Sequence, residues 1–265
     1  MKRPRCAAPP TTRHFYPVTK PEILVCNDVE ELNRRAAAQF IAVASEAIAR
    51  AGRFSVALSG GSTPKALYAL LASPDYRDRV DWSRTHLFWG DERCVPPDHA
   101  ESNFRMVNEA LLSKIQIPGK NIHRLAGEKK PNQAAADYEG ELRDFFALAP
   151  GQLPRFDLIL LGLGEDGHTA SLFPGSSALT EQEHLVATTY VEKLKAHRLT
   201  LTLPVINNAA QVSFLVAGAS KAAIVGNLLG ANSQSFDYPA GRIHPSNGQL
   251  TWFITRDAAG NLAGS

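Results

Sequence analysis

Short apolar runs alternate along this chain with longer segments in which apolar residues recur at helical spacing. The runs predict strands at residues 22–26, 54–58, 85–90, 156–161, 185–190, 198–203, 211–217 and 250–255. The segments between them predict helices through Arg50 with Asp28 as the N-cap, around 64–71, over 101–112 and 132–148, and from 218–221 onward. Such alternation is typical of an α/β protein with a Rossmann-like, doubly wound, mostly parallel sheet and helices on both faces. We therefore expect one α/β domain over residues 22–265.

The composition is that of an ordinary soluble globular protein. Of the 265 residues, 44% are hydrophobic and 20% are charged. No apolar run approaches the length of a membrane span, so we expect no membrane partner. The net charge of +2 is unevenly distributed, because residues 1–21 hold five basic residues and no acidic one. Residues 22–265 carry 23 basic and 26 acidic residues, and this slightly acidic balance gives no indication of nucleic-acid binding.

The first 21 residues differ in character from the rest of the chain. They are basic and proline-rich, and we predict a disordered leader rather than a secretory signal because no apolar segment follows the charges. A transit peptide, which is also poor in acidic residues, stays open as an alternative. The three cysteines, Cys6, Cys26 and Cys94, form no C-x-x-C pair, which favours a reducing compartment. We therefore expect a cytoplasmic protein.

The apolar run at 156–161 ends in a glycine-rich turn that carries acidic and imidazole side chains. Asp166 and His168 are separated only by Gly167. In an open α/β sheet, ligands bind at the carboxyl ends of the strands, so this turn lies where a site is expected. A carboxylate beside an imidazole can fix the orientation of the ring. We interpret Asp166 and His168 as an acid–base pair.

The same turn matches the pattern G-x-G-x-x-G over residues 162–167, which follows a strand in dinucleotide-binding proteins. Glu165 and Asp166 would repel a pyrophosphate, and Pro174–Gly175 interrupts the long helix that such a site requires. We therefore expect no cofactor. A tight turn whose glycines supply positive φ angles is the simpler explanation of the glycines, although it does not explain the neighbouring acid and histidine.

A second glycine-rich loop, Ser59–Pro64, links a predicted strand to the following helix. Gly60 and Gly61 allow backbone amides to point inward, Thr63 is a candidate N-cap, and Pro64 suits the first helical position. Free amides and the macrodipole at a helix N-terminus favour anions. Since no Gly-Lys-Ser/Thr follows, the loop is not a Walker A loop, and a sugar phosphate is the favoured ligand. A plain strand-to-helix turn is the alternative.

Polar groups also follow two other predicted strands. Asp91, Glu92 and Arg93 come directly after the third strand, and Ser102–Arg105 add polar groups toward the same edge of the sheet. A surface ion pair between Asp91 and Arg93, of little consequence for stability, is the alternative to a functional role. Lys221 stands beside the start of the helix that follows a later strand.

Together these segments resemble the 6-phosphogluconolactonases, and the resemblance extends from about residue 22 onward. It rests on Ser59–Pro64, Trp89–Arg93 with Ser102–Arg105, Leu163–Gly175, and Arg198–Thr202. That family shares its Rossmann-like fold with the glucosamine-6-phosphate deaminases, which are similar in the glycine loop and the Asp-Gly-His turn. The deaminases usually carry an Asn-Glu-Pro stretch after the turn, where this chain has Ser-Leu-Phe-Pro at 171–174. This departure favours the lactonase.

The resemblance implies hydrolysis of 6-phospho-D-glucono-1,5-lactone to 6-phosphogluconate, a step of the pentose phosphate pathway. It implies three catalytic residues: His168 as the general base, Asp166 fixing its tautomer, and Arg93 contacting either the phosphate or the lactone carbonyl. The implied substrate-binding residues are Gly60, Gly61, Ser62, Thr63, Asp91, Arg198 and Lys221, among which the loop amides, Arg198 and Lys221 hold the phosphate. No metal is implied, and the sequence has no His-x-His or His-x-x-x-His spacing.

Other functions lead to different expectations. A glucosamine-6-phosphate deaminase is one alternative, and a non-catalytic sugar-phosphate sensor is another. A sensor requires the glycine loop and Lys221 but not His168. A serine esterase requires a G-x-S-x-G elbow, which the sequence lacks. The oligomeric state is unknown from the sequence.

Overall fold

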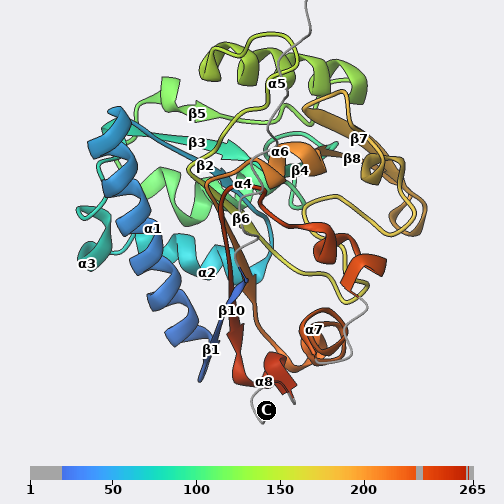
Figure 1. Ribbon diagram of the computed structural model, residues 1–265. Coiled ribbons are helices and arrows are strands. Elements are labelled where there is room, and N and C mark those ends of the chain that lie inside the picture. Colours follow the sequence, from blue (N-terminus) through green and yellow to red (C-terminus); the bar gives the residue numbers. More distant parts are fainter. Residues whose placement is uncertain (1–19, 231–234, 261, 263–265) are drawn as a thin grey trace, which may run out of the picture.

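The computed structural model of the protein describes residues 20–230, 235–260 and 262. Its centre is a seven-stranded sheet with the order β1-β10-β9-β6-β2-β3-β5 (Figure 1). All neighbouring pairs in this sheet are parallel, which confirms the predicted Rossmann-like, mostly parallel architecture. The strands are β1 (Glu22–Cys26), β2 (Phe54–Leu58), β3 (Thr85–Trp89), β5 (Ile122–His123), β6 (Leu158–Leu161), β9 (Gln211–Val216) and β10 (Gln249–Thr255). Apart from Lys20 and Pro21, the predicted leader lies outside the described residues.

A second, three-stranded antiparallel sheet has the order β4-β8-β7. Its strands are β4 (Asp91–Arg93), β7 (Val186–Val191) and β8 (Ala196–Leu201). The strands predicted at 185–190 and 198–203 therefore exist, shifted by one or two residues, but they do not join the main sheet. The polar triplet after β3 is itself a strand, because pairing with β8 satisfies a backbone whose charged side chains give no strand signal.

Helices lie on both faces of the main sheet. The helices of the described residues are α1 (Val29–Ala51), α2 (Ser62–Leu71), α3 (Pro74–Arg77), α4 (Asn103–Ala110), α5 (Pro131–Phe146), α6 (Leu203–Asn207), α7 (Ala222–Leu229) and α8 (Arg256–Ala259). In Figure 1, α1 and α2 lie on one side of the sheet and α7 lies on the other. No helix in the described part of the chain is long and apolar enough to cross a membrane.

The first helix has the end signals that its sequence predicts. The Asp28 carboxylate accepts the backbone N–H of Glu31 at 2.8 Å, and the Glu31 carboxylate accepts the backbone N–H of Asn27 at 2.8 Å. Together these contacts form a reciprocal cap that satisfies helix-start donors. Gly52 ends the helix in the left-handed conformation at φ 74°.

The order of the main sheet reverses direction between β2 and β6. From β2 the chain proceeds outward through β3 to β5, whereas from β6 it proceeds the other way through β9 to β10. Every residue of β2 and β6 is buried, because helices cover both faces of these central strands. The loops that leave two adjacent strands in opposite directions open a crevice at their carboxyl ends.

Two histidines form a polar chain at the β3–β5 edge of the sheet. His86 Nδ1 lies 3.1 Å from His123 Nε2, and His123 Nδ1 lies 2.6 Å from Glu141 Oε1. His123 also stacks on Phe88, with the ring centroids 4.1 Å apart. Burial lowers the pKa of His86 to about 4, with smaller contributions from the charges of His123, Arg53 and Lys120.

This pKa predicts a specific loss of stability in acid. An unfolded histidine titrates near pH 6.5, so below that pH the unfolded chain takes up a proton that folded His86 refuses until about pH 4. Stability must fall as the pH falls through this window. We expect His86→Gln to show a smaller drop in melting temperature between pH 7 and pH 4.5 than the wild type.

The matched control is His244→Gln, which changes an exposed histidine. It should keep the wild-type pH dependence of the melting temperature. An equal drop in the wild type and His86→Gln would show that His86 does not contribute to acid instability.

Candidate functional site

The crevice between β2 and β6 contains a pocket of about 290 Å³. The loops after β2, β6 and β9 form its wall, together with β4 and the start of α4. Eight of the ten residues predicted for the site line it: Gly60, Gly61, Ser62, Thr63, Asp91, Arg93, His168 and Lys221. Asp166 and Arg198 do not line it, but each lies beside a residue that does, His168 and Arg93 respectively.

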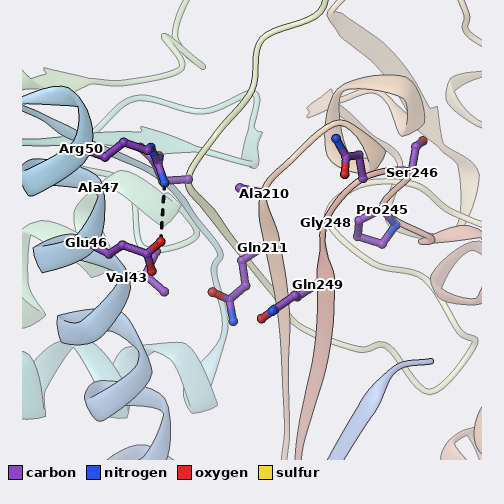
Figure 2. A pocket seen from close by; sticks show the side chains of 12 residues that line it. Val43, Glu46, Ala47, Arg50, Ala210, Gln211, Pro245, Ser246, Gly248 and Gln249 are labelled. Atoms are coloured by element: carbon purple, nitrogen blue, oxygen red, sulfur yellow. Dashed lines mark hydrogen bonds and ion pairs between the residues drawn. The ribbon is translucent and has the colours of Figure 1, made fainter. Parts of the chain in front are cut away.

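A larger pocket of about 440 Å³ lies at the opposite ends of the strands, between α1 and the starts of β9 and β10 (Figure 2). Its charged groups pair with one another: Arg50 lies 3.8 Å from Glu46 and 2.7 Å from Asp157. No residue predicted for the site lies there. The smaller pocket, which contains Arg93, Lys221 and His168, is therefore the candidate site.

Asp166 and His168 form the pair that their spacing predicts. His168 Nδ1 lies 2.5 Å from Asp166 Oδ1, which also accepts the backbone N–H of His168 at 3.2 Å. Partial burial raises the pKa of Asp166, but the hydrogen bonds and charge of His168 outweigh it and lower the pKa below its usual value. The carboxylate is thus ionised at neutral pH and must accept from Nδ1–H. This tautomer leaves the lone pair on Nε2, where it can act as a base.

Two glycines of the turn leave space that a larger residue would fill. A Cβ at Gly164 would lie 2.0 Å from His168 Nδ1, and a Cβ at Gly167, whose φ is 77°, would lie 2.6 Å from Tyr238 Cδ1. The Gly164 N–H donates to the carbonyl of His168 at 2.9 Å and closes the turn. The described segment 162–176 contains no helix, so the G-x-G-x-x-G pattern here is a tight turn and not a helix start.

The glycine loop after β2 leads directly into α2. The helix begins at Ser62, with Gly61 as the N-cap at φ 104°, and no side chain accepts from the first turn. The prediction of Thr63 as the N-cap and Pro64 as the first helical residue is therefore wrong, because glycine reaches this positive φ and starts the helix earlier. The amides of Ser62 and Thr63 are uncapped by any side chain, an arrangement that favours an anionic ligand.

Two arginines oppose each other across the smaller sheet. Arg93 on β4 is the register partner of Arg198 on β8, so both side chains lie on one face. Arg198 is only 7% exposed and donates to the carbonyl of His197 at 3.2 Å, while Arg93 donates to the carbonyl of Glu101. Among the described residues, neither guanidinium belongs to an ion pair. Burial and the adjacent charge of Arg93 lower the pKa of Arg198. Opposed like charges are destabilising, so this pair favours a bound anion.

Lys221 adds a third basic group from another strand end. It follows β9 and is the N-cap of α7, as the sequence predicts. Its Nζ lies 3.9 Å from the exposed carboxylate of Glu165 on the turn after β6. An exposed ion pair at this distance is weak, so Lys221 is available to a stronger anionic ligand.

Asp91 is a buried carboxylate and not half of a surface ion pair. It is 7% exposed, and its Oδ2 accepts the hydroxyl of Ser171 at 2.7 Å. Asn103 Nδ2 donates to the Asp91 carbonyl at 3.0 Å and lies 3.3 Å from its Oδ1. Sequence reasoning assigned no role to Asn103 or Ser171, although both lie in segments that it singled out. Their convergence on Asp91 depends on the pairing of β4.

The structure gives no indication of a metal ion. Among the residues that it describes, no group of three or more histidine, cysteine, aspartate or glutamate side chains is arranged to hold one. The acidic and imidazole groups of the pocket bind protein partners, as described above.

Comparison with known proteins adds independent evidence. The profile of the family described as glucosamine-6-phosphate isomerases/6-phosphogluconolactonase matches residues 27–252. A 6-phosphogluconolactonase from Synechocystis is 47% identical over 219 residues, which cover 82% of this chain and 88% of the relative. The solved structure of 6-phosphogluconolactonase from Trypanosoma cruzi superposes with a TM-score of 0.79 at 29% identity, covering 93% of this chain and 98% of that one.

A monomeric glucosamine-6-phosphate deaminase also has a similar structure. Its TM-score is 0.73, and the match covers 90% of this chain and 98% of the deaminase. At 23% identity this likeness shows a shared fold only. The choice between the two activities therefore depends on the residues of the site.

The basic cluster predicts affinity for a simple anion. Arg198→Met keeps an apolar stem but removes the positive charge behind Arg93, so inorganic phosphate should bind about 3-fold more weakly through the loss of a longer-range attraction. Isothermal calorimetry at low ionic strength measures the dissociation constant. Arg155→Met, which changes an exposed arginine outside the pocket, should leave it unchanged. Equal affinity in Arg198→Met and the wild type would exclude Arg198 from the anion site.

Proposed function

The chain belongs to the family of glucosamine-6-phosphate isomerases and 6-phosphogluconolactonases, and on this premise we propose that it hydrolyses 6-phospho-D-glucono-1,5-lactone to 6-phosphogluconate. The Asp166–His168 pair carries the proposal, because it presents a basic Nε2 to a pocket that also contains two cationic side chains, Arg93 and Lys221. A phosphorylated ester requires both features: an activated water and a site for the dianion.

His168 acts as the general base in this proposal. Its Nε2 takes a proton from a water molecule, whose oxygen attacks the lactone carbonyl carbon. The tetrahedral intermediate then breaks the bond between that carbon and the ring oxygen. The ring oxygen leaves with the proton held by the imidazolium, which gives a carboxylic acid and a free hydroxyl group. Asp166, ionised and hydrogen-bonded to Nδ1, stabilises the imidazolium between the two proton transfers.

The phosphate binds to the α2 start and the basic side chains. Uncapped amides of Ser62 and Thr63 donate to it, and Lys221, which also lines the pocket, supplies a positive charge. Arg93 is the arginine that lines the pocket, so we assign it to the phosphate, with Arg198 behind it. A dianion there relieves the repulsion between the two guanidinium groups.

Surroundings of the histidine favour a lactonase over a deaminase. A deaminase must also move protons during ring opening and isomerisation, which requires another acidic group near the histidine. In this chain Phe173 stacks on His168, with the centroids 4.4 Å apart, and Leu172 is fully buried. One face of the imidazole is therefore covered by an apolar ring, and a single base suffices for attack by water. A sensor without catalysis leaves the Asp166–His168 pair unexplained.

Two wider expectations belong to the same proposal. A single domain over 22–265 is supported by one hydrophobic cluster that includes residues of both sheets. A cytoplasmic location is supported by Cys26 and Cys94, which are both unpaired.

A direct comparison of two substrates tests the function. Purified protein is given 6-phosphogluconolactone, with acid release followed by pH-stat, and separately glucosamine-6-phosphate, with ammonia release followed enzymatically. We expect lactone hydrolysis well above the spontaneous rate and no ammonia. Ammonia release at enzymatic rates would replace the lactonase assignment, and failure on both substrates combined with binding of 6-phosphogluconate would favour a sensor.

The geometry of the turn predicts that a substitution at Gly164 reduces catalysis by displacing His168. In Gly164→Ala the new methyl group must displace the His168 ring, since the Cβ would lie 2.0 Å from Nδ1. Turnover should fall toward that of His168→Asn, by about 10²–10⁴-fold for a lost general base. Affinity for inorganic phosphate should persist, because the basic cluster is untouched.

Gly162→Ala is the matched control for this experiment. Its Cβ would meet nothing closer than Ser59 Oγ at 3.7 Å, which is ordinary van der Waals contact. Near-wild-type turnover is therefore expected. If Gly164→Ala keeps wild-type turnover after correction for spontaneous hydrolysis, the placement of His168 does not determine the rate.

A further inference from the structure

Asp91 is held by hydrogen bonds and not by a counter-ion. Ser171 donates to one carboxylate oxygen and Asn103 approaches the other, while Asn103 also donates to the Asp91 carbonyl. All three residues are at least nine-tenths buried. A carboxylate offers about four acceptor positions, so two directions remain after these contacts. Since Asp91 lines the pocket, these directions are available to a ligand.

Asn103 is itself fixed at the start of α4. Its backbone N–H donates to Glu92 Oε1 at 2.7 Å, and the N–H of Phe104 donates to Glu92 Oε2 at 2.8 Å. Ser102 caps the helix by accepting from the N–H of Arg105 at 3.1 Å. The buried carboxylate of Glu92 thus joins β4 to the helix and leaves Asn103 little freedom to move.

The Asn103 side chain also fits against the glycine loop. A Cβ built on Gly60 would lie 1.9 Å from Asn103 Oδ1, so the amide occupies the place that any larger residue at position 60 would need. Asn103 therefore contacts the glycine loop on one side and Asp91 on the other. It links the region proposed to bind the phosphate to the acid that faces the sugar.

We propose that Asn103 is a substrate-positioning residue, which orients the Asp91 carboxylate toward a ring hydroxyl of the sugar and sets the distance between that carboxylate and the glycine loop. This inference rests on the proposed function, since it requires a polyhydroxylated sugar phosphate as the ligand. Sugar hydroxyls are donors, and a preoriented carboxylate is their strongest side-chain acceptor. Asn103 thus affects catalysis through the geometry of binding, whereas His168 performs the proton transfer.

Two substitutions at the same position separate positioning from structural support. Asn103→Ala removes the donor, so the Michaelis constant should rise about 10–100-fold, as expected when a hydrogen bond to a charged group is lost. The turnover number should change much less. Asn103→Asp has nearly the same shape but places a second carboxylate against that of Asp91. Two carboxylates this close repel each other unless they share a proton, which they hold only at acidic pH.

The pH profile is therefore the decisive readout. The kcat/KM of each variant is divided by that of the wild type at every pH from 8 to 5.5, which cancels the titration of groups that they share. For Asn103→Asp the ratio should recover by about 10-fold toward pH 5.5, as a proton restores the hydrogen bond. For Asn103→Ala the ratio should stay constant. Asn108→Asp, on the exposed face of the same helix, is the matched control and should remain at wild-type values.

Melting temperatures and product affinity complete the test. The dissociation constant of 6-phosphogluconate, measured by calorimetry, should follow the Michaelis constant. If the Michaelis constant of Asn103→Ala stays within twofold of the wild-type value, the positioning role is rejected. It is also rejected if kcat/KM of both variants falls by the same factor at every pH and their melting temperatures fall equally. If the wild type binds 6-phosphogluconate without hydrolysing the lactone, the proposed function fails while the affinity ratios still decide the inference. If it does neither, both fail.

Discussion

The reversal of strand order between β2 and β6 is the constraint on which the rest of the structure depends. Parallel strands must bury both faces, so each connection crosses the sheet through a helix or a longer excursion. Connections that leave two adjacent strands in opposite directions cannot cover the same edge. The glycine loop and the Asp166–His168 turn occupy these two strand ends, and β9 brings Lys221 to the same edge. Groups more than 150 residues apart in the sequence thus meet at one edge of the sheet.

In the described part of the chain, Asp91 and Asp166 form no ion pair with Arg93 or Arg198. The carboxylates of Asp166 and Asp91 bind His168 and neutral donors, respectively, while Arg93 and Arg198 oppose each other and Arg198 receives only longer-range attraction from Glu101 and Asp91. Pairing the acids with the arginines would satisfy both within the protein and leave little for a ligand. Two opposed guanidinium groups cost folding stability, and a dianion bound as we propose would offset this cost. Part of the affinity proposed for this site would therefore come from relief of the repulsion between the two arginines.

The sequence predicts the parts of this structure that local patterns determine. Buried strands such as β6, the capped helix α1 and the two glycine turns follow from residue type and spacing, and the Asp166–His168 contact follows from two-residue proximity. The separate sheet was missed because β4 is a strand only when β8 lies beside it, and charged side chains hide it. Thr63 suits a cap by residue type, but it lies inside the first turn because Gly61 precedes the helix. Asn103 has no local signal, since its contacts with Asp91 and Gly60 arise from three separate segments.

One fold supports two chemistries in this family, and the residues beside the histidine distinguish them in physical terms. Opening an ester with water requires one group that gives back the proton it has taken. Isomerisation with loss of ammonia requires several proton transfers at different carbons, and therefore more than one ionisable group within reach. Phe173 stacks on one face of His168, and Asp166 occupies Nδ1. Only Nε2 of His168 is left for proton transfer, and the other acid that lines the pocket, Asp91, is already hydrogen-bonded to Ser171 and Asn103, so the site suits a single-base reaction.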